Sequence, residues 1–198
     1  MEICSFCGGM IECRSGEQVC SKCLTTCQKK IRGFKKVSFT QFFLDIQKSF
    51  GEEVDPFAVE GIYNAIKFPQ RATRFSAGYD FFSPIKFYLP PGKTIKIPTG
   101  IKAYMNPNEV LSIYVRSSTG FKYNVNLLNN VGQIDQDYFN NTDNEGHIWM
   151  GFKNHGDKDW FVEAGEAFGQ GIFMEYLIAD EDHPKSEERV GGIGSSSK

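Results

Sequence analysis

Apolar and polar residues alternate over several short stretches between residues 95 and 152, and this period of two restricts the fold more than any other feature. The alternating positions are Ile95, Ile97, Thr99, Ile101, Ala103 and Met105, then Leu111, Ile113 and Val115, then Ile148, Met150 and Phe152. Successive side chains of a strand point to opposite faces, so each stretch predicts a strand with one buried face. Turn sequences, Pro-Pro-Gly at 90–92 and Asn-Pro-Asn at 106–108, separate the stretches. No ten-residue helical pattern lies between them, which favours a mainly β sandwich, jelly roll or barrel over a parallel α/β sheet.

Two short helices are predicted before these strands. Ser38 and Gln41 have the spacing of a capping box, and Asp55-Pro56 places an N-cap residue directly before a proline at the first helical position. Apolar residues follow both signals at helical spacing: Phe39, Phe42, Phe43, Ile46 and Phe50, then Val59, Ile62, Tyr63 and Ile66. We interpret these aromatic and aliphatic side chains as core packing.

All six cysteines fall within the first 27 residues, which marks a separate small module. Two Cys-x-x-Cys pairs stand out, Cys4 with Cys7 and Cys20 with Cys23. Four thiolates suit a structural, tetrahedral Zn²⁺ site, and the metal would supply folding energy that so short a segment lacks. Cys13 or Cys27 could replace one of these ligands, and the alternative is a set of idle or oxidisable thiols.

Charge and hydropathy restrict the location of the protein. The net charge is −2, no apolar run of 18 residues exists, and the N-terminus lacks a secretory signal pattern. We therefore expect a cytoplasmic protein without membrane contact, in which cysteines stay reduced. The basic residues Lys29, Lys30, Arg32, Lys35 and Lys36 predict a solvated linker, with a nucleic-acid or protein contact of the N-terminal module as the alternative.

Five later stretches carry groups suited to nucleotide chemistry. They contain Asp80 in SAGYDFF, Arg116, Ser117 and Ser118 in VRSSTGFKYN, Asp135, Asp137 and Tyr138 in NNVGQIDQDY, Gln170 in GEAFGQGIF, and Arg189 in ERVGGIGSSSK. Arginine side chains, serine hydroxyls and the backbone N–H groups of glycine-rich loops donate hydrogen bonds to phosphate oxygens. In an extended strand, Asp135 and Asp137 would share one face. Each stretch alone also has an ordinary interpretation: a surface ion pair, a turn cap or a polar chain end.

In this order and spacing, the five stretches resemble the motifs of the trimeric dUTP diphosphatase (dUTPase) family. The resemblance covers about two thirds of the chain, from Pro69 to the C-terminus, and the segment KKVSFTQFF to YNAIKFPQRAT is similar to the variety found in low-GC Gram-positive bacteria and their phages. It implies a jelly-roll dUTPase-like barrel, a homotrimer with sites between subunits, and hydrolysis of dUTP to dUMP and diphosphate with Mg²⁺. The zinc-ribbon-like module lies outside the resemblance.

The resemblance also implies a role for each motif residue. Asp135 would activate the attacking water, Tyr138 would pack on the deoxyribose and exclude a ribose, and Asp80 would support the magnesium water shell. The remaining substrate-binding positions are Asn129, Gly132 and Ile134 at the uracil, Arg116, Ser117, Ser118 and Gln170 at the phosphates, and Arg189, Gly192, Ile193, Gly194 and Ser195 in a closing C-terminal arm. Asp137 would orient the hairpin or a neighbouring residue.

Several positions depart from the family pattern. Val115 replaces a common proline, Ala167 and Phe168 replace Arg-Ile, and Ile193 replaces an aromatic residue over the uracil, which would weaken arm closure. The segment 140–146 is longer than in compact members, and we expect an external loop there.

Two other functions compete with dUTP hydrolysis. A dCTP deaminase, or its bifunctional relative, would need a glutamate on the strand after the hairpin, and HIWMGFKN contains no acid. A nucleotide-binding regulatory protein would act through the N-terminal module. The predicted organisation is a zinc module at 1–27, a basic linker with two helices at 28–66, a β domain at 67–180 and a flexible arm at 181–198.

Overall fold

The computed structural model describes residues 11–14, 17–20, 31–51, 53–184 and 191. The chain divides into two compact units, residues 1–31 and 32–198. In the first unit, β1 (Ile11–Arg14) pairs antiparallel with β2 (Glu17–Cys20). Of the predicted zinc ligands, Cys4, Cys7 and Cys23 lie outside the described residues, and Cys20 is described only as the last residue of β2.

The second unit is mainly β, as the alternating pattern predicts. Its strands are β3 (Gly33–Lys36), β4 (Gln70–Arg71), β5 (Tyr79–Phe82), β6 (Phe87–Leu89), β7 (Thr94–Pro98), β8 (Ile101–Tyr104), β9 (Glu109–Tyr114), β10 (Val125–Leu127), β11 (Gly132–Asp135), β12 (Trp149–Asn154), β13 (Trp160–Val162) and β14 (Ala167–Glu175). Its helices are α1 (Phe39–Phe50), α2 (Pro56–Ala65), α3 (Ser117–Tyr123) and the short 3₁₀ helix η1 (Gln136–Tyr138).

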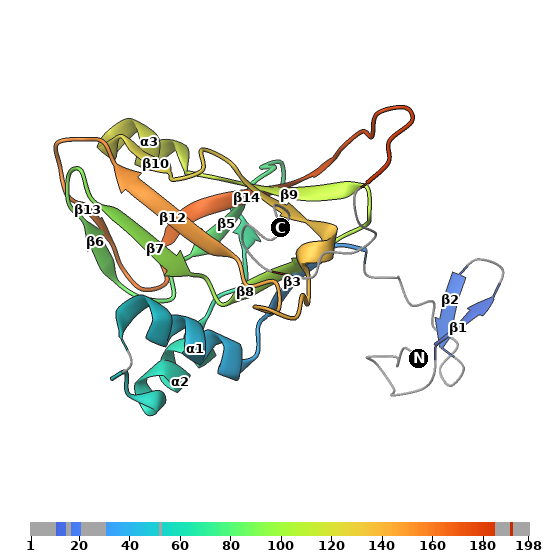
Figure 1. Ribbon diagram of the computed structural model, residues 1–198, viewed down its shortest axis with the longest axis horizontal. Helices are drawn as coiled ribbons and strands as arrows, with labels where there is room; N and C mark the ends of the chain where they lie inside the picture. The colour runs from blue at the N-terminus through green and yellow to red at the C-terminus, as the bar shows by residue number, and fades with distance from the viewer. Residues whose placement is uncertain (1–10, 15–16, 21–30, 52, 185–190, 192–198) are drawn as a thin grey trace. The chain divides into compact units, whose positions relative to one another are not determined.

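Two antiparallel sheets build most of this unit (Figure 1). The larger has the strand order β11-β9-β14-β5-β4, and the other has the order β10-β12-β7. Two-stranded pairs, β13-β6 and β3-β8, complete the described β structure. Strand β3 corrects the prediction of a basic linker there, because Gly33 to Lys36 pair in register with Tyr104 to Ile101.

The core lies between the sheets. Phe152 of β12 meets Phe168 of β14 with ring centroids 5.5 Å apart, and both side chains are fully buried. Gly169 faces Met150 so closely that an added Cβ would lie 2.6 Å from its sulfur. Close packing of this kind fixes the spacing of the two sheets. Phe168, which departs from the family pattern, is therefore a core residue.

Both predicted N-terminal helices form. The Ser38 hydroxyl accepts a hydrogen bond from the Gln41 N–H at 3.1 Å, and the Asp55 carboxylate accepts one from the Phe57 N–H at 3.1 Å. Phe42 and Ile46 of α1 are buried, whereas Phe50, expected on the same face, is 47% exposed. None of the described helices is long and apolar enough to cross a membrane.

The loop expected at 140–146 forms, but it is anchored to the rest of the unit. Asn140, Thr142 and Asp143 are exposed, whereas Asn141 and Gly146, and His147 directly after the loop, are buried. Glu145 accepts hydrogen bonds from the backbone N–H of Ser38 at 2.9 Å and its hydroxyl at 2.5 Å, and forms an ion pair with Lys102 at 3.0 Å. Burial raises the pKa of Glu145, but the hydrogen bonds from Ser38 and Lys102 outweigh this effect and hold the pKa below its ordinary value.

Candidate functional site

The two hairpin carboxylates lie where β11 ends. Asp135 is the last residue of β11, opposite Val110 of β9, and Asp137 belongs to η1. The prediction that an extended strand gives both a common face is therefore wrong, because the chain turns into a 3₁₀ helix after Asp135. Asp135 is half-buried and Asp137 is exposed.

Both carboxylates nevertheless line one cleft of about 710 Å³. Ser112 and Gln133 form its wall and are joined by a hydrogen bond of 2.8 Å. Glu175, the last residue of β14, and Tyr176 directly after it also line the cleft. A cleft of this size can hold a nucleoside.

The turn before β11 is shaped by Gly132. A Cβ there would lie 3.2 Å from Cβ of Ile113 and 3.5 Å from Nδ2 of Asn129. A side chain at this position would therefore separate the hairpin from β9. Asn129 is exposed, and Ile134, opposite Leu111, is half-buried.

Tyr138 is held more firmly than the sequence indicates. Its side chain is only 4% exposed. Its hydroxyl donates to the carbonyl of His147 at 3.0 Å and accepts from Nδ2 of Asn144 at 2.7 Å. The isolated chain therefore presents only a narrow part of this side chain to a ligand.

Asp80, Arg116 and Gln170 form a second group. Arg116 and Asp80 form an ion pair in which Nε lies 3.1 Å from Oδ1, and Nη2 donates to Oδ2 at 3.5 Å. Nη1 of Arg116 donates to the Ala167 carbonyl at 3.2 Å. Gln170 lies opposite Asp80 in the sheet and donates to the Val115 carbonyl at 3.1 Å. Arg116 does form an ion pair, and that pair orients its guanidinium beside the exposed Ser117 and Ser118 at the start of α3.

These two groups occupy opposite ends of β9. Asp135 pairs with Val110, whereas Gln170 pairs with Tyr114. Four residues of antiparallel strand span about 14 Å. Within one chain, the Asp135 carboxylate is therefore remote from the Arg116 group.

The other predicted site residues have mixed outcomes. Arg189, Gly192, Ile193, Gly194 and Ser195 lie outside the described residues. Within the part of the chain that the structure describes, no three His, Cys, Asp or Glu side chains gather closely enough to bind a metal ion. Sequence reasoning gave no role to Asp45, Glu109 or His147, which are buried polar residues. Each forms an ion pair or hydrogen bond with a residue far away in the sequence, Asp45 with His147 and Glu109 with Arg32, and no local motif marks such contacts.

A model of the dUTPase family matches residues 64–197 of this sequence. The chain belongs to the dUTPase family. It is 48% identical over 132 residues to the deoxyuridine 5'-triphosphate nucleotidohydrolase of Lactococcus lactis, covering 66% of this chain and 88% of that protein. It is 35% identical over 144 residues to the enzyme of the same name from Haemophilus influenzae strain PittEE, covering 69% and 91%.

Solved structures agree with this family. The dUTPase of Streptococcus mutans has 37% sequence identity and a TM-score of 0.56, with 75% of this chain and 98% of that chain covered. This match confirms the expected mainly β, dUTPase-like fold.

Proposed function

We propose that the protein hydrolyses dUTP to dUMP and diphosphate. The observation that carries the proposal is the position of Asp135, a half-buried residue that lines a nucleoside-sized cleft. Membership of the dUTPase family and the names of the bacterial relatives support the same reaction. The strand after the hairpin, β12, contains no acid, which counts against deamination of dCTP.

Asp135 acts as the general base in this proposal. Water is a weak nucleophile, and a carboxylate within hydrogen-bond reach accepts its proton as the oxygen attacks the α-phosphorus. The bond from that phosphorus to the bridging oxygen of the β-phosphate breaks, and diphosphate leaves with the electron pair. Asp137 lines the same cleft and would orient the hairpin.

The phosphates bind at the Arg116 group. A triphosphate carries about four negative charges, which fixed donors must neutralise. Arg116 donates one hydrogen bond to Asp80 and one to the Ala167 carbonyl, and its remaining N–H groups include donors that can reach phosphate oxygens. Ser117 and Ser118 add hydroxyl and backbone donors, and Gln170 lies in the adjacent strand.

Magnesium fits such a site through the substrate. Mg²⁺ binds phosphate oxygens and water with only one or two protein carboxylates, and Asp80 is the carboxylate nearest Arg116. When bound, the ion would neutralise charge that develops on the phosphates. Because Arg116 occupies both carboxylate oxygens, we propose that Asp80 primarily orients Arg116 and contacts the ion through water.

The base and sugar bind at the hairpin. The turn containing Asn129 and Gly132 would read the uracil edge through side chain and backbone, with Ile134 beside it. Tyr138 would limit the space at the sugar, which leaves no room for a ribose 2′-hydroxyl.

A complete site requires more than one chain. Because Asp135 and Arg116 are attached at opposite ends of β9, a phosphate bound by one Arg116 would meet the Asp135 of another subunit. A homotrimer with shared sites satisfies this geometry. The C-terminal arm with Arg189 and residues 192–195 would cover the bound triphosphate.

The N-terminal cysteines are proposed to bind structural zinc through Cys4, Cys7, Cys20 and Cys23, in a module separate from catalysis. In this proposal, the protein is a dUTPase of the low-GC Gram-positive and phage type that carries an additional zinc-ribbon-like module at its N-terminus. Metal analysis of purified protein should find one zinc per chain, lost in Cys4→Ser with Cys7→Ser. Equal zinc in this variant would contradict the ligand set.

The decisive assay is diphosphate release from dUTP, dCTP, dTTP and UTP with magnesium. Release from dUTP alone is expected, with a loss of about 10²-fold or more in Asp135→Asn. Asp137→Asn is the matched control, because it alters a carboxylate of the same cleft and should keep most of the activity. No release from any nucleotide by folded protein would exclude the proposed reaction.

A further inference from the structure

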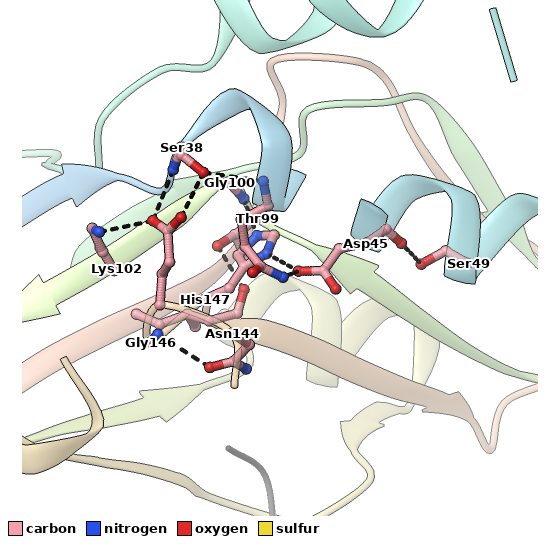
Figure 2. Close-up of polar contacts among 12 residues, drawn as sticks. Ser38, Asp45, Ser49, Thr99, Gly100, Lys102, Asn144, Gly146 and His147 are labelled. Carbon is pink, nitrogen blue, oxygen red and sulfur yellow. Dashed lines mark hydrogen bonds and ion pairs between the residues drawn. The ribbon is translucent and has the colours of Figure 1, made fainter. Parts of the chain in front are cut away.

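The buried residue His147 connects the nucleoside site to helix α1. His147 is completely buried, and Asp45 of α1 is only 6% exposed. Figure 2 shows the contact between them: Nδ1 of His147 lies 2.6 Å from Oδ2 of Asp45. The two residues are 102 positions apart in the sequence, so this contact depends on tertiary packing.

The second nitrogen of the ring fixes its tautomer. Nε2 of His147 accepts a hydrogen bond from the Gly100 N–H at 2.7 Å, so the proton of the neutral ring lies on Nδ1 and is donated to Asp45. Phe42 of α1 packs beside the imidazole, with ring centroids 6.1 Å apart. The ring is therefore restrained by hydrogen bonds at both nitrogens and by packing.

His147 in turn holds Tyr138. The backbone carbonyl of His147 accepts the Tyr138 hydroxyl proton at 3.0 Å. At the other end of the tyrosine, the Asn141 side chain donates to the Tyr138 carbonyl at 2.8 Å and to the Asn144 side chain at 2.8 Å. Gly146 passes so near that a Cβ there would lie 2.4 Å from the Tyr138 carbonyl oxygen.

A second connection joins α1 to the same segment. Glu145 accepts hydrogen bonds from the backbone and hydroxyl of Ser38, the N-cap of α1. Helix α1 lies outside residues 64–197, the part that the family model matches, yet it contacts the segment that follows Tyr138 at two points.

We propose that helix α1 is a positioning element for Tyr138, acting through Asp45 and His147, and that it sets the preference for deoxyribose over ribose. This inference rests on the proposed function, in which Tyr138 limits the space at the sugar. The two sugars differ by one hydroxyl, so a small movement of a side chain in a close-packed pocket changes whether the larger one fits. Without Asp45, the buried Nδ1–H of His147 lacks its acceptor, and rearrangement of His147 would displace the carbonyl that holds Tyr138.

Asp45 allows a conservative rescue variant. Oδ2 accepts both from His147 and from Nε2 of Gln41 at 2.9 Å. In Asp45→Asn, the amide carbonyl oxygen can occupy this position and accept both hydrogen bonds. In Asp45→Ala, neither bond can form. Val59→Ala is the matched stability control, because it removes buried atoms from α2 without touching these contacts.

The measurement is the ratio of kcat/KM for dUTP to kcat/KM for UTP, with melting temperatures measured in parallel. We expect Asp45→Ala to lower this ratio about tenfold or more, because small misplacements at a site have effects of this order. Asp45→Asn should keep the wild-type ratio, and Val59→Ala should melt earlier without changing it. An Asp45→Ala protein that is less stable but keeps the wild-type ratio would overturn the inference, as would an Asp45→Asn protein that loses it.

Two further experiments test the positioning role of α1 separately from the folding of Asp45→Ala and from the proposed hydrolysis of dUTP. If Asp45→Ala does not fold, Glu145→Ala breaks the more exposed connection to Ser38 and should lower the ratio in the same direction; an unchanged ratio would then overturn the inference. Binding of α,β-imido analogues of dUTP and UTP gives the same preference without turnover. A wild type that binds with preference but hydrolyses neither nucleotide would reject the proposed reaction and leave the positioning role measurable.

Discussion

The buried carboxylate of Glu109 stays charged because several hydrogen-bond donors surround it. Its side chain is 2% exposed, and it accepts hydrogen bonds from Arg32, from the Asn106 backbone N–H and from the Asn106 side chain. The Arg32 hydrogen bond is the largest influence and, against the effect of burial, lowers the pKa of Glu109 from 4.5 to about 2. A group with a lowered pKa in the folded state stabilises the fold above its unfolded pKa.

This pair predicts an acid-dependent loss of stability. The contribution of Glu109 should be complete above pH 4.5 and should be lost as the pH falls from 4.5 through about 2. At pH 7, Glu109→Gln should lower the free energy of unfolding by about 1.5–3 kcal/mol, the range for hydrogen bonds to charged groups. Urea unfolding at pH 7 and pH 3 tests this: the difference between wild type and variant should shrink at pH 3. Glu60→Gln, an exposed carboxylate of α2, should show little effect at either pH.

Among the elements, α1 combines a core face with a solvent face. Phe42 is fully buried between α2 and the sheet, whereas Leu44, two positions along the helix, is 53% exposed. Phe42→Ala should therefore lower the free energy of unfolding by about 3–5 kcal/mol, because it leaves a cavity in the core. Leu44→Ala should change it by less than about 0.5 kcal/mol. Chemical denaturation of the two variants is the test, and equal losses would contradict the assigned orientation of α1.

The sequence predicts those elements whose signals are local. The capping residues Ser38 and Asp55 start α1 and α2 where expected, and alternation identifies β9 and β12. Helix α3 is not predicted, because Ser117 to Tyr123 contain Gly120 and polar residues that are typical of a loop. The anchoring contacts of Glu145 and His147 are not predicted, because their partners, Ser38 and Asp45, lie more than a hundred residues away.

In the candidate site, too, local motifs are predicted from the sequence and tertiary contacts are not. The motif order identifies Asp80, Arg116, Asp135 and Gln170 as candidates, and the structure brings three of them together through the neighbouring strands β5 and β14 and the start of α3. The separation of Asp135 from this group depends on strand register, which a motif does not contain. The hydrogen bonds that fix Tyr138 depend on tertiary contacts for the same reason.

At the scale of the whole molecule, β9 separates Asp135 from the Arg116 group. Asp135 is attached opposite Val110 and the Arg116 group beside Tyr114, about 14 Å apart along the strand. If catalysis needs a carboxylate from one subunit and an arginine from another, two inactive variants can complement each other. A site within one chain could not be restored in this way.

We therefore predict that Asp135→Asn and Arg116→Ala, each inactive alone, recover activity when co-expressed and purified through two different tags. In a trimer that carries both tags, one of the three sites combines an intact Asp135 from one subunit with an intact Arg116 from its neighbour, which gives about a third of the wild-type activity. Co-expression of two Asp135→Asn chains with the same tags is the control and should remain inactive. Mixed oligomers without activity would show that both residues must belong to one chain, which would contradict the proposed sites shared between subunits.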